Sequence, residues 1–273
     1  MNRLKNLPTL RVNTSEKVSV TYKGKRYEGF KGDTVASLLY ANGVRIFGRS
    51  LKYHRPRGIY SLDGECSNTC MQIDDIPNER TENIFARDGM TVKEQNVKGS
   101  AENDMMGFID KLDWAMPAGF YYHTMHKPAK MWPMAMKQIR KAAGLGTLSQ
   151  NFNRHERFDE IFPKTEVCVI GGGPAGMTAA LEAADKGVRV TLLESRPWLG
   201  GFYEWRTSVD EEGNFLYSKA KTLADKVKAH PGIRVFKHTS MVGAYNNNLI
   251  TAFQKGGDTD SFQERYIEIR AES

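Results

Sequence analysis

The sequence predicts an α/β protein with an N-terminal and a C-terminal domain. Three observations support this fold class. A strand–turn–strand–helix pattern lies in the first part of the chain, within residues 17–98. A buried strand that leads through a glycine-rich turn into a helix begins at residue 166. A second buried strand, residues 188–193, follows that helix, and this alternation is typical of a parallel sheet.

The first domain, residues 17–98, has the pattern of a β-grasp, the fold of plant-type ferredoxins. Alternating apolar and polar residues on both sides of the turn at residues 23–25 predict a hairpin. Gly32-Asp33-Thr34 supplies a capping residue for the helix that follows, and Gly43 ends it. The predicted elements are strands at residues 18–22 and 26–30, a helix at residues 35–42 and a strand near residues 71–73. Residues 1–16 precede them as a polar arm.

Cys66 and Cys70 fall where a ferredoxin carries its cluster-binding loop. A plant-type cluster needs four thiolates in a C-x4-C-x2-C…C pattern, whereas this region offers only this pair, spaced as C-x3-C. A zinc site would also lack ligands unless His54 or a partner supplied them. We therefore expect a loop that has lost its iron–sulfur cluster and is now structural, with Cys66 and Cys70 as the only metal-ligand candidates.

The segment at residues 48–59 is basic and aromatic, and Pro56 stiffens it. It can be a solvated loop, or it can be a docking surface or an anion site. The sequence leaves both interpretations open.

Residues 99–160 are expected to connect the two domains. The predicted parts are a helix at residues 101–112, an aromatic stretch at residues 116–126, a helix at residues 134–143 and a polar linker at residues 151–163. His123 and His126 have the spacing of a metal-binding pair on one face of a helix. No carboxylate or third ligand stands near them in the sequence, so we expect them to pack within the aromatic stretch.

The second domain, residues 161–273, begins with the motif that is most informative about ligand binding. An apolar strand at residues 166–170 runs directly into Gly171-x-Gly173-x-x-Gly176, and a helix pattern follows at once. In this setting the glycines allow a tight turn, a close approach of the backbone to a pyrophosphate, and close packing of the helix on the sheet. The start of the helix also attracts phosphate groups through its free N–H groups. The motif predicts a dinucleotide site.

The position of Glu194 agrees with this prediction. Gly187 ends the helix, and the next strand finishes at Glu194, about 20 residues beyond the turn, as ribose recognition requires. A carboxylate at this place accepts hydrogen bonds from the ribose hydroxyls and repels a 2′-phosphate, which favours NAD or FAD over NADP. The cation of Arg196 weakens this preference slightly. The pair Gly200-Gly201 follows at the expected distance.

The sequence of the rest of the second domain predicts a helix and further strands. The expected elements are a helix at residues 218–230, a strand at residues 233–238 and an antiparallel meander at residues 241–245, 249–253 and 265–270. A doubly wound domain also needs a further central strand followed by a glycine turn, and none occurs before residue 273. We therefore expect an incomplete doubly wound FAD/NAD-binding domain of the Rossmann type.

Composition argues against several classes of protein. No apolar run of about 18 residues could span a membrane, and no secretion signal begins the chain, so the predicted location is the cytoplasm. Three cysteines are too few for a disulfide framework. The net charge of +7 raises the question of nucleic acid, but most of the basic residues are scattered. We expect neither a nucleic-acid partner nor a membrane partner.

Five stretches of the sequence, taken in order, are more specific than any of these patterns alone. They are residues 32–39, 48–58, 117–122 and 139–146, and the glycine motif at residues 171–176. Together they resemble the N-terminal part of the α subunit of heterotetrameric sarcosine oxidase and of related multi-subunit amine and opine oxidases and dehydrogenases. The resemblance covers nearly all of the chain from Val18 onward.

The resemblance implies a ferredoxin-like β-grasp without a cluster, followed by a domain that binds NAD, or FAD as in the dehydrogenase relatives. No catalytic residue is expected in this chain. Carried over by position, the implied cofactor contacts are Gly171, Gly172, Gly173, Ala175, Gly176, Glu194, Ser195, Arg196, Gly201, Phe202 and Met241.

The resemblance also implies a hetero-oligomer with a flavin-bearing β subunit and smaller subunits. In that family an FAD on the β subunit oxidises a secondary amine such as sarcosine, and electrons pass to an FMN between the α and β subunits. The family's chains are longer than this one, so we expect a fragment, a split-gene subunit or a truncated chain. Two rival functions stay open, a non-catalytic assembly module and an electron-transfer module with an iron–sulfur cluster.

Overall fold

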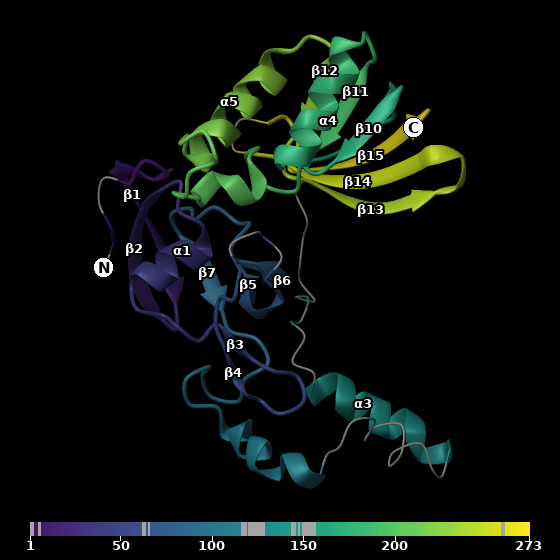
Figure 1. Ribbon diagram of the computed structural model, residues 1–273. Coiled ribbons are helices and arrows are strands. Elements are labelled where there is room, and N and C mark those ends of the chain that lie inside the picture. The colour runs from purple at the N-terminus through teal and green to yellow at the C-terminus, as the bar shows by residue number, and fades with distance from the viewer. Residues whose placement is uncertain are drawn as a thin grey trace. The chain divides into compact units, whose positions relative to one another are not determined.

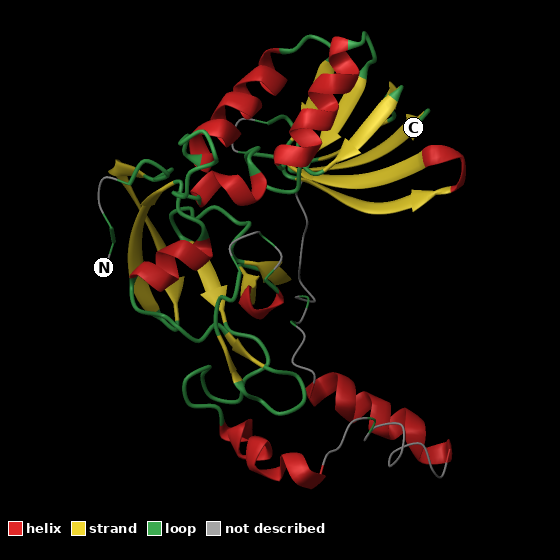
Figure 2. Cartoon of the chain, viewed as in Figure 1, coloured by secondary structure: helices red, strands yellow, loops and turns green. Residues whose placement is uncertain are grey.

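The computed structural model describes residues 3–4, 7–61, 64, 66–115, 119, 129–142, 146, 148, 157–257 and 260–273. The chain divides into two compact units, Met1–Phe152 and Asn153–Ser273. Both combine helices with sheets (Figures 1 and 2), which confirms the predicted α/β class.

The first unit is built on a five-stranded sheet with the order β2-β1-β7-β5-β6. Its strands are β1 (Asn13–Tyr22), β2 (Lys25–Lys31), β5 (Cys70–Ile73), β6 (Ile76–Arg80) and β7 (Met90–Lys93), and a small separate hairpin pairs β3 (Gly48–Arg49) with β4 (Pro56–Arg57). β1 lies antiparallel to β2 and parallel to β7. The predicted hairpin is therefore present and its first strand lies inside the sheet.

Helix α1 (Val35–Ala41) covers this sheet and closes the core of the first unit. Thr34 caps the helix, because its Oγ1 accepts a hydrogen bond from the Ser37 N–H at 3.2 Å. Leu38 and Leu39 are fully buried in the same cluster as Met71 of β5. The cap and the helix are confirmed close to the predicted bounds.

The other helices of the first unit are η1 (Ser67–Thr69), η2 (Met105–Ala115), η3 (Ala129–Met131) and α3 (Trp132–Ala142), where η marks a 3₁₀ helix. α3 matches the helix predicted at residues 134–143. Except for Gly119, the aromatic stretch at residues 116–126, with His123 and His126, lies outside the described residues. Along the described residues, no helix is both long and apolar enough to cross a bilayer.

Three predicted boundaries are wrong. β1 begins at Asn13 inside the expected arm, because Asn13 pairs with Lys31 beyond an irregularity in the strand. Residues 101–112 are not an α-helix: the 3₁₀ helix η2 begins only at Met105, because the backbone before it is held in a turn by Asp104. The expected polar linker contains the strand β8 (Phe158–Ile161), which pairs in parallel with residues 264–267.

The basic segment at residues 48–59 is used inside the first unit. The Arg49 guanidinium donates to the carbonyl oxygens of Ala101 at 2.7 Å and Glu102 at 3.0 Å. His54 Nδ1 lies 2.6 Å from Asp104 Oδ2, and both side chains are buried. These side chains fasten the chain near residue 101, a role that neither sequence interpretation had proposed.

Asp104 is the buried end of this contact. Its carboxylate also accepts hydrogen bonds from the backbone N–H groups of Lys98 at 2.9 Å and Met106 at 3.0 Å. Burial by itself would raise the pKa of this carboxyl, but the hydrogen bonds from Lys98, Met106 and His54 outweigh it and lower the pKa. The ionised form of Asp104 therefore stabilises the turn before η2.

The second unit consists of two sheets and two main helices. The parallel sheet has the order β10-β11-β12, and the second sheet has the order β13-β14-β15-β8, with β9 also pairing with β15. The remaining elements are β9 (Lys164–Thr165), β10 (Val167–Ile170), α4 (Pro174–Asp185), β11 (Val190–Leu193), η4 (Gly201–Trp205), α5 (Leu216–Ala229), β12 (Ile233–Phe236), β13 (Thr239–Tyr245), η5 (Asn246–Asn248), β14 (Leu249–Lys255) and β15 (Glu264–Ala271).

The parallel sheet lies between the helices and the second sheet (Figure 1). Met177 of α4 and Val227 of α5 are buried against one face together with Leu192. Leu193 of β11 is buried on the other face in the same cluster as Ile267 of β15. The successive antiparallel pairing of β13, β14 and β15 confirms the predicted meander.

The chain returns to the parallel sheet after β15. The Ser273 N–H donates to the Glu166 carbonyl oxygen at 2.9 Å, and the Ser273 carbonyl oxygen accepts from the Cys168 N–H at 3.0 Å. This is the hydrogen-bond pattern of a parallel pair. Residue 273 therefore lies against the edge of β10 that β11 does not occupy.

We predict that Asp104→Asn lowers the free energy of unfolding by about 2 kcal/mol at neutral pH, because charge-assisted hydrogen bonds are replaced by weaker ones. The matched control is Asp110→Asn, which removes the half-exposed ion pair with Arg55 and should cost less than about 1 kcal/mol. Urea unfolding followed by circular dichroism measures both changes.

The effect of Asp104 should also depend on pH. Its pKa is lowered in the folded protein, so its contribution is present above the ordinary carboxyl pKa and is lost as the pH falls through the lowered value. The stability difference between the wild type and Asp104→Asn therefore narrows in acid. A difference that is independent of pH would contradict this assignment.

Candidate functional site

The glycine turn lies at the carboxyl end of β10, where α4 begins. The Gly171 N–H donates to the Leu193 carbonyl oxygen at 2.8 Å, which ties the turn to β11. Gly173 is the N-cap of α4. The N–H groups of Ala175 and Gly176 lie in the first turn, so they have no acceptor inside the helix and are available to an anion.

The turn leaves little room for side chains at two of its positions. A Cβ atom at Gly176 would lie 1.9 Å from the Gly171 carbonyl oxygen, and one at Gly172 would lie 2.4 Å from Leu199 Cδ2. Gly171 has φ of +102°, which side-chain-bearing residues rarely adopt. The structure therefore supplies a steric reason for Gly176 and a backbone reason for Gly171, whereas a Cβ atom at Gly173 would meet only Gly201 Cα, at 3.9 Å.

The second glycine pair closes over this turn. The Gly200 N–H donates to the Gly172 carbonyl oxygen at 2.9 Å. A Cβ atom at Gly201 would lie 2.8 Å from Gly173 Cα, so the two backbones are nearly in contact. Two loops that are separate in the sequence thus form one backbone-lined cradle. The sequence predicted Gly201 as a cofactor contact, but it did not predict the hydrogen bond of Gly200 to the turn.

Glu194 joins these loops from the end of β11. Its side chain is buried, and Oε2 accepts a hydrogen bond from the Gly172 N–H at 2.7 Å. Oε1 accepts from the Arg196 N–H at 2.7 Å and from the Ser195 hydroxyl at 3.3 Å. A carboxylate offers about four acceptor positions, so capacity is left for a ribose hydroxyl. The acid therefore fixes the turn, and its role as a ribose acceptor stays a prediction.

The remaining predicted contacts lie on a short helix and on a strand of the second unit. Phe202 in η4 and Met241 on β13 are both partly exposed. The beginning of β13 is bonded to the backbone of Glu194, because the Thr239 N–H donates to the Glu194 carbonyl oxygen at 2.8 Å. The structure thus brings Met241 into the neighbourhood of Glu194, although the two residues are far apart in the sequence.

The Arg196 side chain lies within an aromatic cluster that the sequence did not reveal. Its Cζ atom is 5.1 Å from the ring centroid of Trp198 and 4.8 Å from that of Trp205. Its Nη1 atom is 3.6 Å from Glu204 Oε2. Glu204 was missed because a lone acid in an aromatic stretch carries no periodic or motif signal.

Cys66 and Cys70 flank the short helix η1. Cys66 is fully buried and its N–H donates to Glu82 Oε1 at 2.6 Å, while burial raises the pKa of the Cys70 thiol. Among the described residues, no group of three or more histidine, cysteine, aspartate or glutamate side chains could hold a metal ion. A chain with three cysteines cannot supply the four thiolates of a [2Fe–2S] cluster.

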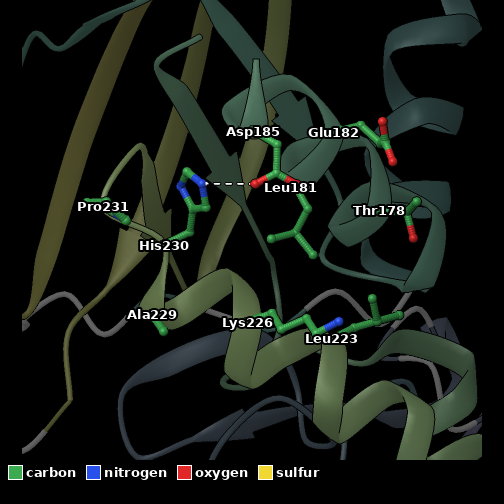
Figure 3. A pocket seen from close by; sticks show the side chains of 9 residues that line it. All are labelled: Thr178, Leu181, Glu182, Asp185, Leu223, Lys226, Ala229, His230 and Pro231. Atoms are coloured by element: carbon green, nitrogen blue, oxygen red, sulfur yellow. Dashed lines mark ion pairs between the residues drawn. The ribbon is translucent and has the colours of Figure 1, made fainter. Parts of the chain in front are cut away.

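A groove of about 520 Å³ runs between α4 and α5 on the helical side of the second unit. Figure 3 shows His230 and Asp185 pointing toward each other across it, with His230 Nε2 at 3.3 Å from Asp185 Oδ1. His230 Nδ1 accepts from the Gly232 N–H at 3.0 Å, so the ring joins the end of α5 to β12. None of the predicted nucleotide contacts lines this groove.

Comparison with known proteins agrees with both parts of the fold. Residues 15–97 match the family model described as 2Fe-2S iron-sulfur cluster binding domain, and residues 166–209 match the model described as FAD dependent oxidoreductase. Sarcosine oxidase subunit alpha of Rhizobium meliloti (strain 1021) is 32% identical over 249 residues, which are 89% of this chain and 25% of that protein. The chain is therefore similar to part of the sarcosine oxidase α subunits.

A second sarcosine oxidase α subunit, from Corynebacterium sp. (strain U-96), is 27% identical over 90% of this chain and 21% of its own length. The chain thus spans about a quarter or less of the length of these relatives. The structure of L-proline dehydrogenase from P. horikoshii matches 98% of the chain and 42% of that protein, with a TM-score of 0.58 at 20% identity. It supports the fold alone.

These relationships confirm the resemblance and the order of the ferredoxin-like and FAD/NAD-type domains. The match to an iron–sulfur domain concerns the fold of residues 15–97, because the cysteines needed for a plant-type cluster are not all present. The second unit is similar to FAD-dependent oxidoreductases over residues 166–209. The individual nucleotide contacts stay predictions.

We predict that Gly176→Ala lowers the free energy of unfolding of the second unit by about 3 kcal/mol, because the new Cβ atom would overlap the Gly171 carbonyl oxygen. The control, Glu182→Ala, lies on the exposed side of the same helix and should change stability by less than about 0.5 kcal/mol. Urea unfolding measures both. Equal stability of the two variants would contradict the tight packing of the turn.

Proposed function

We propose that this chain binds NAD or FAD as the N-terminal part of a sarcosine oxidase-like α subunit. The observation that carries the proposal is the cradle formed by the two glycine loops, held together by the Glu194 carboxylate and by the Gly200–Gly172 hydrogen bond. The close approach of its two loops at Gly173 and Gly201 requires glycine, because a Cβ atom at Gly201 would lie 2.8 Å from Gly173 Cα. The match to FAD dependent oxidoreductase over residues 166–209 supports a nucleotide in this place.

The residues have distinct tasks in binding. The first turn of α4 offers backbone N–H groups and a partial positive charge to the pyrophosphate. Glu194 accepts from the ribose, and Ser195, Phe202 and Met241 border the adenosine half. A bound NAD or FAD supplies a ring that can accept a hydride. This chain binds and orients the nucleotide, and no residue in it is assigned to catalysis.

We propose a flavin-bearing partner subunit as the place of substrate oxidation, with smaller subunits in the same complex. The relatives' name, sarcosine oxidase subunit alpha, supports a hetero-oligomer and a secondary amine such as sarcosine as the substrate. An FMN at the interface with the partner belongs to the same proposal. The low cysteine count agrees with the cytoplasm as the compartment.

Exposed apolar side chains on η2 support a partner surface. Met105, Phe108 and Trp114 are all exposed, and no residue of η2 is buried. Large apolar residues gathered in this way usually mark a contact surface. We assign the surface at residues 105–115 to the flavin-bearing subunit.

An assembly module is the rival function. In that case the nucleotide only stabilises the complex, and turnover does not depend on it. An electron-transfer module with an iron–sulfur cluster at Cys66 and Cys70 has less support, because the described residues form no group of three or more metal-ligand side chains.

We predict that Glu194→Ala weakens NAD or FAD binding by about tenfold to a hundredfold, because the ribose and the Gly172 N–H both lose a charged acceptor. Isothermal titration measures the affinity, and amine turnover is measured in the assembled complex. The control is Glu182→Ala on the exposed face of α4. Loss of the nucleotide with unchanged turnover would favour the assembly module over the enzyme subunit.

We predict that the double variant Phe108→Ser with Trp114→Ser weakens the complex with the flavin-bearing partner by at least about tenfold, because aromatic anchors dominate such interfaces. The matched control is Phe162→Ser, which changes an exposed phenylalanine between β8 and β9. Co-purification of the partner with a tagged chain gives the readout. Equal recovery of the partner with both variants would show that η2 does not contact the partner subunit.

A further inference from the structure

A cation and an acid lie side by side at the proposed ribose site. Arg196 is two residues beyond Glu194, and its backbone N–H donates to Glu194 Oε1 at 2.7 Å. In dinucleotide sites an acid here accepts the 2′-hydroxyl of NAD, whereas a nearby arginine accommodates the 2′-phosphate of NADP. The sequence contains both residue types: Glu194 favours NAD or FAD over NADP, and Arg196 weakens that preference slightly.

The Arg196 side chain is held by two aromatic rings and an acid. The guanidinium lies close to the faces of Trp198 and Trp205, with Cζ at 5.1 Å and 4.8 Å from the ring centroids. Its Nη1 atom is 3.6 Å from Glu204 Oε2, and the two ionic side chains are only 12% and 7% exposed. Cation–π attraction and the buried opposite charge both favour this position.

Glu204 is fixed by the loop that closes over the phosphate turn. It lies in η4, which starts at Gly201, and a Cβ atom at Gly200 would lie 3.4 Å from Glu204 Cβ. Gly200 itself donates to the Gly172 carbonyl oxygen. The loop that completes the cradle therefore also carries the acid that pairs with Arg196.

We propose that Glu204 sets the nucleotide specificity of the site by holding Arg196 away from the ribose. The inference rests on the proposed dinucleotide function and names the class of nucleotide that the site accepts. Glu194 then faces the ribose with an uncompensated negative charge, so the site takes a nucleotide with a free 2′-hydroxyl and rejects a 2′-phosphate. Glu204 is a positioning residue, because it acts through Arg196.

The test compares ADP-ribose with 2′-phospho-ADP-ribose on the full chain freed of nucleotide, since ADP-ribose contains the half that NAD and FAD share. Isothermal titration should show that the wild type binds ADP-ribose about tenfold or more tightly than its 2′-phosphate. Glu204→Gln should raise the relative affinity for the 2′-phosphate by about tenfold, because Arg196 is released to pair with it. Adding Arg196→Met should abolish that gain.

Glu204→Asp provides a second variant if Glu204→Gln does not fold by circular dichroism. It keeps the negative charge, but its side chain is one methylene shorter, so the carboxylate lies farther from Arg196. It should therefore also raise the affinity for 2′-phospho-ADP-ribose relative to ADP-ribose. An unchanged ratio in a folded Glu204 variant that still binds ADP-ribose overturns the role of Glu204, as does a gain that survives Arg196→Met. Failure of the wild type to bind ADP-ribose is a different result, which overturns the dinucleotide function and this inference with it.

Discussion

The bridge between Glu194 and the Gly172 N–H is the interaction on which the candidate site depends. The carboxylate leaves the end of β11 and reaches the turn between β10 and α4, so it links two strand ends of the parallel sheet. Gly172 in turn accepts the Gly200 N–H through its carbonyl oxygen. Gly172 thus hydrogen-bonds both to the Glu194 side chain and to the second glycine loop. We expect a substitution at any of these positions to disturb the others.

This arrangement explains why part of the site was predictable from the sequence. The glycines and Glu194 have fixed spacing along a strand–turn–helix–strand unit, and spacing is what a sequence shows directly. Glu204 and the tryptophans around Arg196 were not predictable, because their contact depends on how η4 folds back toward β11. The sequence placed Arg196 at the ribose, and its side-chain position is visible only in three dimensions.

The same distinction holds for the fold. The hairpin, α1, α4 and the meander follow from local alternation, caps and turn residues, and the structure has them near the predicted positions. The strand β8 was missed because a short polar strand becomes recognisable only when β15 is beside it. The basic segment at residues 48–59 was read as a surface feature, but Arg49 and His54 are paired with the chain around residues 101–104.

The first unit has the fold of an iron–sulfur domain without the cysteines that bind a plant-type cluster. Residues 15–97 keep the β-grasp of an iron–sulfur domain, yet the thiolates of a plant-type cluster are not present, and Cys66 is buried as an apolar residue. What the first unit offers is a stable core and the exposed apolar residues of η2. The redox chemistry of this account therefore depends on the nucleotide in the second unit and on a partner.

The most direct measurement of the central claim is the identity of the nucleotide held by the purified wild-type chain. The protein is denatured, and the released compound is identified by absorbance and mass. The account predicts NAD or FAD at about one molecule per chain, the stoichiometry of a single cradle. A chain that releases no dinucleotide, and that binds neither NAD nor FAD when they are supplied, would contradict it.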